Sequence, residues 1–197
     1  RIFDICFSVF IIVGLLSWLT PLLAIFIKIE SSGPVFFRQK RNGLNYKEFN
    51  CFKFRSMNLN EIADLEQVSK NDPRITNVGK FIRKTSIDEL PQFFNVLLGD
   101  MSVVGPRPHM VSHTEMYARR IDKFMVRHFI KPGITGLAQT NERLDKLRKQ
   151  KEVENDKDII FRVKYDIFYV ENWSILLDIK IIFMTLYNAI KGEEKAY

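Results

Sequence analysis

The feature that most constrains this chain is an uncharged run of 23 residues near its amino terminus, residues 5–27. Asp4 precedes the run and Lys28 follows it. As a single helix the run would be roughly 35 Å long, enough to cross a hydrocarbon core of about 30 Å. It is too long for a signal peptide, and no small-residue cleavage site follows it. The run therefore predicts a membrane-inserted helix, with a buried core helix as the alternative.

Thr20 and Pro21 divide this run unequally. A proline inside a helix removes one backbone hydrogen bond and kinks the helix. If the helix is broken there, residues 5–19 form only about 22 Å of helix, which is too short to cross alone. Two paths are therefore open, a kinked helix that spans the membrane and a re-entrant helix that leaves on the side it entered.

The positive charge of the chain is concentrated just after this run. The net charge is +7, and residues 28–55 contain seven basic residues against Glu30 and Glu48. Such a patch suits nucleic acid, anionic lipid headgroups or phosphorylated small molecules. The lipid-embedded segment on the same chain argues against nucleic acid. Cys6 and Cys51 form no ligand pattern, and we interpret both as reduced packing residues.

A turn-rich segment at residues 30–34 marks the predicted boundary between a membrane helix, 1–30, and a catalytic domain, 31–197. Short strands are predicted at residues 35–39 and 49–55, with Asn42-Gly43 between them as a turn. Helices are predicted at residues 58–68, 113–129 and 175–190. A further helix is predicted to begin within residues 86–91 and to run to residue 98. The expected fold class is α/β, mostly helical with a small β-hairpin. The apolar helix at 175–190 suits either core packing or a membrane interface.

Asp88 and Glu89 are the leading candidates for chemistry. Pro91 is tolerated only in the first turn of a helix, so both carboxylates should lie at a helix amino end. Ser86-x-x-Glu89 also matches a capping box, which would make the pair structural. Arg83 and Lys84 precede it, however, and a carboxylate beside cations stays ionised and can act as a nucleophile or a magnesium ligand.

Two further residues could contribute to a site. Arg107 lies between Pro106 and Pro108, a rigid loop that suits bidentate phosphate contact, although a surface arginine on a stiff loop is equally compatible. Asp100 follows Gly99 and could be a turn former or a second acidic ligand.

Seven short segments, in order along nearly the whole chain, resemble the bacterial sugar transferase family, the monotopic polyprenyl-phosphate phosphoglycosyl transferases. They are residues 33–43 (GPVFFRQKRNG), 52–57 (FKFRSM), 72–76 (DPRIT), 86–93 (SIDELPQF), 99–102 (GDMS), 105–108 (GPRP) and 131–136 (KPGITG) with Ala138-Gln139.

The resemblance implies a re-entrant membrane helix broken at Thr20-Pro21, interfacial amphipathic helices, and a place on the cytoplasmic face of the bacterial inner membrane. It implies Mg²⁺, a nucleoside-diphosphate sugar donor and a polyprenyl phosphate acceptor, with a homo-oligomer left open. Asp88 would be the nucleophile and a metal ligand, and Glu89 a base or positioner. Phosphate contacts would come from Arg83, Arg107, Lys53 and Arg55, and the donor-binding loop from Gln139, Asn141 and Arg143.

One departure concerns that loop. Where the family commonly has Asn-Gly-Arg, this chain has Asn141-Glu142-Arg143, so the resemblance does not identify the sugar. The competing hypothesis is a membrane-surface scaffold in which Asp88 and Glu89 only cap a helix. An enzyme alone should release nucleoside monophosphate from a nucleotide sugar.

Overall fold

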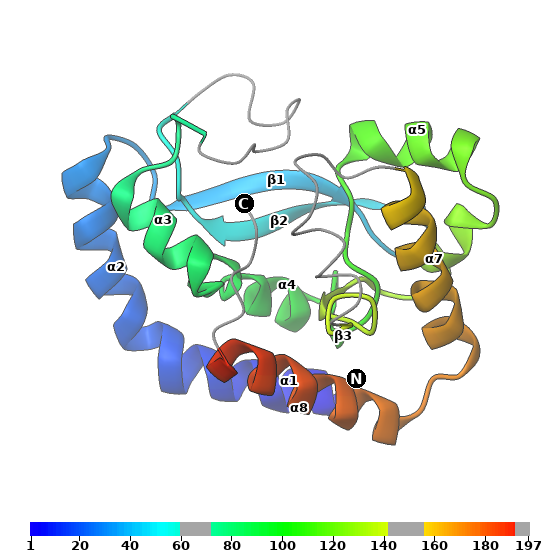
Figure 1. The fold of residues 1–197 in the computed structure, drawn as a ribbon. Helices are drawn as coiled ribbons and strands as arrows, with labels where there is room; N and C mark the ends of the chain where they lie inside the picture. The colour runs from blue at the N-terminus through cyan, green and yellow to red at the C-terminus, as the bar shows by residue number, and fades with distance from the viewer. Residues whose placement is uncertain (60–71, 142–155, 192–197) are drawn as a thin grey trace. The chain divides into compact units, whose positions relative to one another are not determined.

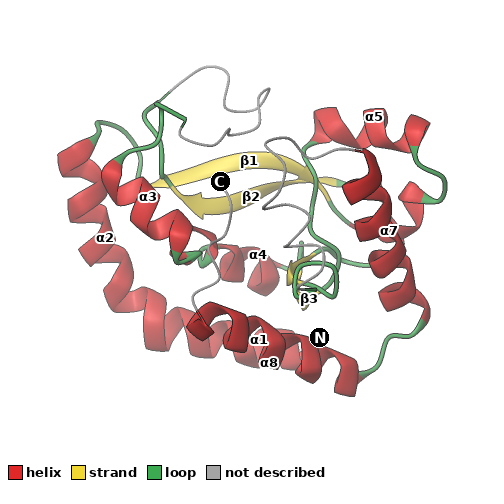
Figure 2. Ribbon diagram, in the orientation of Figure 1, coloured by secondary structure: helices red, strands yellow, loops and turns green. Residues whose placement is uncertain are grey.

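The computed structural model describes residues 1–59, 72–141 and 156–191. Figures 1 and 2 show its helices and strands. The chain forms two compact units. The first comprises Arg1–Lys40 and Asn50–Val103, and the second comprises Arg41–Phe49 and Val104–Ala196. Each unit is described by itself below.

The apolar run forms a helix over Ile2–Glu30, in three parts. These are α1 (Ile2–Ile11), a π-helical turn (Ile12–Leu16) and α2 (Ser17–Glu30). Pro21 lies inside α2, so the helix continues through the pair at which a break was predicted. Figure 1 shows a change of direction between α1 and α2. The re-entrant path remains a prediction.

This helix is long and apolar enough to cross a membrane. Only 17% of its most apolar 18-residue segment is buried inside the protein, whereas the core helix of a soluble domain is mostly buried. Its exposed side chains include Phe10, Val13, Trp18, Ile25 and Ile29. An exposed apolar surface of this extent matches lipid rather than water.

The predicted hairpin is confirmed. Strands β1 (Phe36–Asn42) and β2 (Glu48–Phe54) pair in a two-stranded sheet and are joined by a 3₁₀ turn, Leu44–Tyr46. The first strand extends three residues beyond the predicted end and includes Asn42. Asn45 adopts the left-handed conformation that a tight connection requires (φ 50°).

Three short elements complete the first unit up to β3. Helix α3 (Asn77–Lys84) begins at Thr76, whose hydroxyl accepts a hydrogen bond from Gly79 N at 2.9 Å. A 3₁₀ turn (Ile87–Glu89) and helix α4 (Gln92–Leu98) follow. The end of α4 at Leu98 agrees with the prediction, and Gly99 follows it in the left-handed conformation. The helix predicted at residues 58–68 lies almost entirely outside the described residues.

In the second unit, the single helix predicted at 113–129 is wrong. Helix α5 (Val111–Arg120) ends at Ile121, which is extended, and a 3₁₀ segment (Phe124–Phe129) follows Lys123. Lys123 has φ 56°, which a continuous right-handed helix does not allow. The interruption lets Ile121 and Phe124 join a core with Tyr117, Ile159 and Val163.

The remaining elements of this unit are β4 (Gly133–Thr135), which pairs with β3 (Ser102–Val104), α7 (Asp156–Glu171) and α8 (Ile175–Lys191). The bounds predicted for α8 are confirmed to within one residue. Ile181 is fully buried, but Ile175, Leu176 and Phe183 are exposed. Because its apolar residues occupy both the buried and the exposed side, α8 fits the membrane-interface interpretation.

Candidate active site

Asp88 lies in the first unit, on the 3₁₀ turn that connects α3 to α4. It is only 7% exposed. The capping-box interpretation of this turn is wrong, because Ser86 makes no side-chain capping hydrogen bond. Ser86 is left-handed (φ 58°), and α4 begins only at Gln92, beyond Pro91. The two carboxylates therefore lie on a separate 3₁₀ turn before α4, and the predicted capping box is not formed.

Glu89 is paired with Lys53, which lies on β2. The Lys53 Nζ atom is 2.8 Å from Glu89 Oε1, and the two side chains are 20% and 16% exposed. The structure thus brings together two residues that are 36 positions apart and that were predicted to belong to one site. A cation in contact with Glu89 fixes the position of its carboxylate on the turn that also carries Asp88.

Asn95 sets the register between β2 and α4. Its Oδ1 accepts from Phe52 N at 2.9 Å, and its Nδ2 donates to Asn50 O at 2.7 Å. The side chain is fully buried and satisfies two strand groups on either side of Cys51. Sequence reasoning missed this residue, because an asparagine within an apolar helix carries no signal of its partner.

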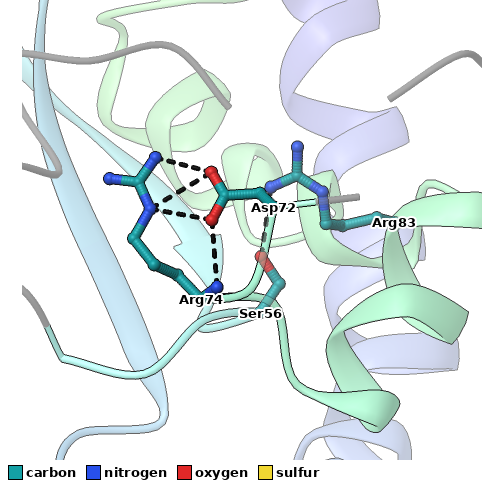
Figure 3. Close-up of polar contacts among 4 residues, drawn as sticks. All are labelled: Ser56, Asp72, Arg74 and Arg83. Carbon is teal, nitrogen blue, oxygen red and sulfur yellow. Dashed lines mark hydrogen bonds and ion pairs between the residues drawn. The ribbon is translucent and has the colours of Figure 1, made fainter. Parts of the chain in front are cut away.

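Arg83 extends from the last turn of α3 and donates from Nη1 to Ser56 Oγ at 3.4 Å. Figure 3 shows these two residues with Asp72 and Arg74. Arg74 binds the Asp72 carboxylate in a bidentate manner, with Nε–Oδ1 and Nη2–Oδ2 distances of 2.9 and 2.6 Å. Asp72 is 4% exposed, so Arg74 compensates a buried charge. Neither residue was predicted as part of a site, although both lie in the DPRIT segment.

Arg55 departs from its predicted role. It is 4% exposed, and its guanidinium donates to Ser32 O and, at 2.7 Å, to Ser31 O. These carbonyls lie just beyond the end of α2. The basic face expected on β2 is therefore not formed at Arg55, which is a structural residue here rather than a phosphate ligand.

Both ends of the apolar helix are held by the elements that carry the site. Near its beginning, Arg1 donates to Val96 O at 2.6 Å and Leu97 O at 2.8 Å, at the end of α4. At its other end, the Glu30 carboxylate accepts from Asn77 N at 2.6 Å and Val78 N at 2.7 Å, at the start of α3. Asp4 additionally accepts from Ser102 Oγ and Val103 N.

The second acidic candidate, Asp100, is a turn residue. Its backbone N donates to Asn95 O at 3.0 Å, and its Oδ2 lies 3.4 Å from Asn95 Nδ2. Helix α4, about 10 Å long, separates it from the turn that carries Asp88. Among the described residues, no three His, Cys, Asp or Glu side chains form a group that could hold a metal ion.

The remaining predicted residues belong to the second unit. Arg107 is half-buried in the Pro106-Arg107-Pro108 loop, and its carbonyl accepts from Arg127 Nη2 at 2.7 Å. Gln139 has neither side-chain polar atom hydrogen-bonded within the described part of the chain, although both atoms are buried. Asn141 is half-buried, and Arg143 lies outside the described residues.

The chain matches known proteins along almost its whole length. Residues 1–192 match the family described as bacterial sugar transferase. A UDP-glucose:undecaprenyl-phosphate glucose-1-phosphate transferase from Klebsiella pneumoniae is 50% identical over 95% of this chain. A UDP-N-acetylgalactosamine-undecaprenyl-phosphate N-acetylgalactosaminephosphotransferase from Aeromonas hydrophila is 40% identical over 92% of it.

The chain spans only 39% and 41% of the length of these two relatives. A third relative has a more similar size. An exopolysaccharide production protein from Rhizobium leguminosarum bv. phaseoli is 41% identical over 91% of both chains.

Proposed function

The chain belongs to the bacterial sugar transferase family, and from this we propose that it transfers a phosphosugar from a UDP-sugar to polyprenyl phosphate. The products are a polyprenyl-diphosphate-sugar and UMP, and the step would begin the membrane-bound assembly of a bacterial glycoconjugate such as an exopolysaccharide. Asp88 is the residue on which the proposal depends. It is a shielded carboxylate next to the Lys53–Glu89 ion pair.

The proposed chemistry has two displacements at one phosphorus. An Asp88 carboxylate oxygen attacks the phosphorus that bears the sugar, and the bond from that phosphorus to the bridging oxygen of the diphosphate breaks. UMP leaves with that oxygen, and an acyl phosphate remains on Asp88. An oxygen of polyprenyl phosphate then attacks the same phosphorus, which releases Asp88 as a carboxylate and forms the new diphosphate. A covalent intermediate divides one difficult transfer into two easier steps.

Glu89 fits a positioning role in this scheme better than that of a base. Its Oε1 already accepts a hydrogen bond from Lys53, which fixes the carboxylate and keeps a cation 2.8 Å away. Lys53 then also offers positive charge beside the attacked phosphorus. Arg83, one turn before Asp88, extends toward Ser56 and supplies a second cation for the substrate phosphates.

The site suits magnesium only in combination with the substrate. Mg²⁺ commonly uses one or two protein carboxylates and completes its shell with substrate oxygens and water. Asp88 can provide one carboxylate, and a protein-only cage of three ligands is absent from the described residues. Bound there with the diphosphate, Mg²⁺ would neutralise the charge that develops on the departing phosphate.

The proposed location is the cytoplasmic face of the inner membrane, where a soluble UDP-sugar can meet a lipid phosphate. We propose that the apolar helix is re-entrant. Arg1 and Glu30, at its two ends, contact α4 and α3, which flank the Asp88 turn in the same polar unit. A helix that spanned the membrane would place these ends on opposite sides of it.

The experiment is a UMP-release assay on the purified chain in lipid nanodiscs with undecaprenyl phosphate and either UDP-glucose or UDP-N-acetylgalactosamine. We expect UMP release with at least one donor. Asp88→Asn should lower the rate at least about 10³-fold, because the amide is a poor nucleophile, while the melting temperature changes little. UMP release by Asp88→Asn at the wild-type rate would refute the role of Asp88. If the wild-type chain releases no UMP with any donor, the scaffold hypothesis is favoured.

A further inference from the structure

The loop that carries Arg107 is hydrogen-bonded at four consecutive carbonyls. Pro106 O accepts from Gly133 N at 3.0 Å, and Arg107 O accepts from Arg127 Nη2 at 2.7 Å. Pro108 O accepts from Arg41 Nη1 at 3.2 Å, and His109 O accepts from Asn42 N at 3.4 Å. The two prolines lack an N–H group, so the loop is held mainly through these carbonyls.

Arg127 differs from the other donors because its partner is the carbonyl of Arg107 itself. Its guanidinium is also fixed from other directions. The Arg127 Nη2 atom lies 2.9 Å from Asp166 Oδ2, and the two side chains are 3% and 4% exposed. Nη1 lies 3.0 Å from His109 Nε2, and the guanidinium carbon is 5.3 Å from the centre of the Phe124 ring. A planar group held in this way has one orientation, and that orientation directs an N–H at Arg107 O.

The charges around Arg127 fit this arrangement. Burial lowers the pKa of His109, and Arg127 lowers it further, so the ring is neutral at physiological pH and can accept from the guanidinium. Burial raises the pKa of the Asp166 carboxyl, and Arg127 and Arg162 oppose that rise. Asp166 therefore depends on these arginines for its negative charge.

Packing alone does not require such a pair. Replacing a buried ion pair by apolar side chains of similar volume is often neutral or stabilising. The charged pair adds direction to the packing. Asp166 on α7 holds Arg127, and Arg127 holds the carbonyl of Arg107. The carbon of this carbonyl is bonded to the Cα atom that carries the Arg107 side chain.

We propose that Arg127 is a positioning residue, anchored by Asp166, that sets the Arg107 guanidinium against a phosphate of the nucleotide-sugar donor. This inference rests on the proposed transferase function and adds a residue to it that contacts no substrate. Misplacing a binding group by about 1 Å can cost roughly 100-fold in rate.

The test combines kinetics and donor binding in nanodiscs for Arg127→Lys, the apolar double variant Arg127→Met/Asp166→Leu, and Arg107→Ala. We expect both Arg127 variants to lower kcat/KM for the UDP-sugar about 10- to 100-fold, mostly through KM. The double variant should keep a melting temperature close to that of the wild type, which separates positioning from folding.

The decisive comparison is made in the Arg107→Ala background. There the Arg127 substitutions should have no further effect on kcat/KM, because the side chain they position is gone. Additive losses, or a folded double variant with wild-type kcat/KM, would overturn the inference. The rise in melting temperature on adding UDP-glucose is measured for the same variants and should show the same non-additivity. Donor binding with this coupling but without UMP release would refute the transferase function and support the positioning role.

Discussion

Lys53 on β2 and Glu89 on the turn before α4 form a half-buried ion pair, with 2.8 Å between Nζ and Oε1. The pair joins the strand that follows the hairpin turn to the turn that carries Asp88. It therefore couples the position of the proposed nucleophile to the sheet as well as to α4.

Lys53→Met should lower UMP release about 10- to 100-fold while changing the melting temperature by only a few degrees. A partly exposed pair contributes little to stability, on the order of 1 kcal/mol or less, whereas loss of a cation beside a transferring phosphate is costly. Lys47→Met is the matched control, since Lys47 is exposed in the hairpin connection. Equal activities of the Lys53 and Lys47 variants would refute a role for Lys53 in the site.

Asn95→Leu should instead act through stability. Without the amide, Phe52 N and Asn50 O lose buried partners, and each such group costs about 1–3 kcal/mol. We expect the melting temperature in detergent to fall by several degrees and activity to fall in parallel. Asn50→Leu, at an exposed position on β2, is the control, because it leaves the backbone carbonyl of Asn50 in place. A variant at Asn95 as stable as the wild type would show that the contact between α4 and β2 is maintained by packing alone.

Much of the fold followed from local patterns in the sequence. The 23-residue apolar run, the Asn42-Gly43 turn and Gly99 each determine backbone geometry within a few residues, and the structure has a helix, a hairpin and a helix end at these places. The helix predicted at 113–129 failed because the break at Ile121–Lys123 serves a core that includes Ile159 and Val163 on α7. A contact with residues about 40 positions away leaves no local pattern.

The site residues likewise include some that local sequence patterns predicted and others that they did not. Asp88, Glu89 and Lys53 were predicted as site residues, and the structure places Lys53 against Glu89 on the Asp88 turn. Arg55 was misassigned because alternation along β2 predicted an exposed basic face, whereas its guanidinium turns to the carbonyls after α2. Arg127 and Asp166 were missed, since two charged residues 39 positions apart in sequence show nothing of their pairing.

Acid should destabilise the protein partly through His128. Burial lowers its pKa to about 4, Arg127 contributes to the decrease, and a hydrogen bond to Gly43 O partly opposes it. Below pH 6.5 the unfolded chain binds a proton at His128 that the folded chain does not, so stability falls between pH 6.5 and 4. The loss is about 3 kcal/mol at pH 4.

The measurement is the melting temperature of wild type and His128→Gln from pH 7.5 to 4. Glutamine retains a donor for Gly43 O but does not titrate. The variant should therefore lose less stability on acidification than the wild type. Identical pH profiles would mean that the pKa of His128 is the same in the folded and the unfolded chain.

Gln139→Leu should separate an effect on donor binding from an effect on the stability of the fold. Both side-chain polar atoms of Gln139 are buried without a partner in the described part of the chain. Leucine removes that cost, so the melting temperature should be unchanged or higher. If the amide binds the donor, the KM for UDP-sugar should rise about tenfold. Thr140→Val is the control, since the Thr140 hydroxyl donates to Leu137 O at 3.2 Å and its loss should lower stability without changing KM. An unchanged KM in Gln139→Leu would exclude the amide from the donor site.

The re-entrant path of the apolar helix can be tested by accessibility. In a chain whose own cysteines are replaced by alanine (Cys6→Ala/Cys51→Ala), a single cysteine is introduced at Ile2 or at Ser32, which are both exposed. Because Arg1 contacts the end of α4 and Glu30 contacts the start of α3, both positions should lie on the cytoplasmic side. An impermeant maleimide should then label neither variant in intact cells and both after permeabilisation. Labelling of the Ile2→Cys variant in intact cells would show that the helix spans the membrane.

Arg1→Gln in the same background should weaken the docking of α1, because it removes the charge from the donors to Val96 O and Leu97 O. We expect that variant to lose activity severalfold while its Ile2→Cys site stays protected, since a segment that leaves the membrane on its entry side cannot be exposed outside by loosening one end.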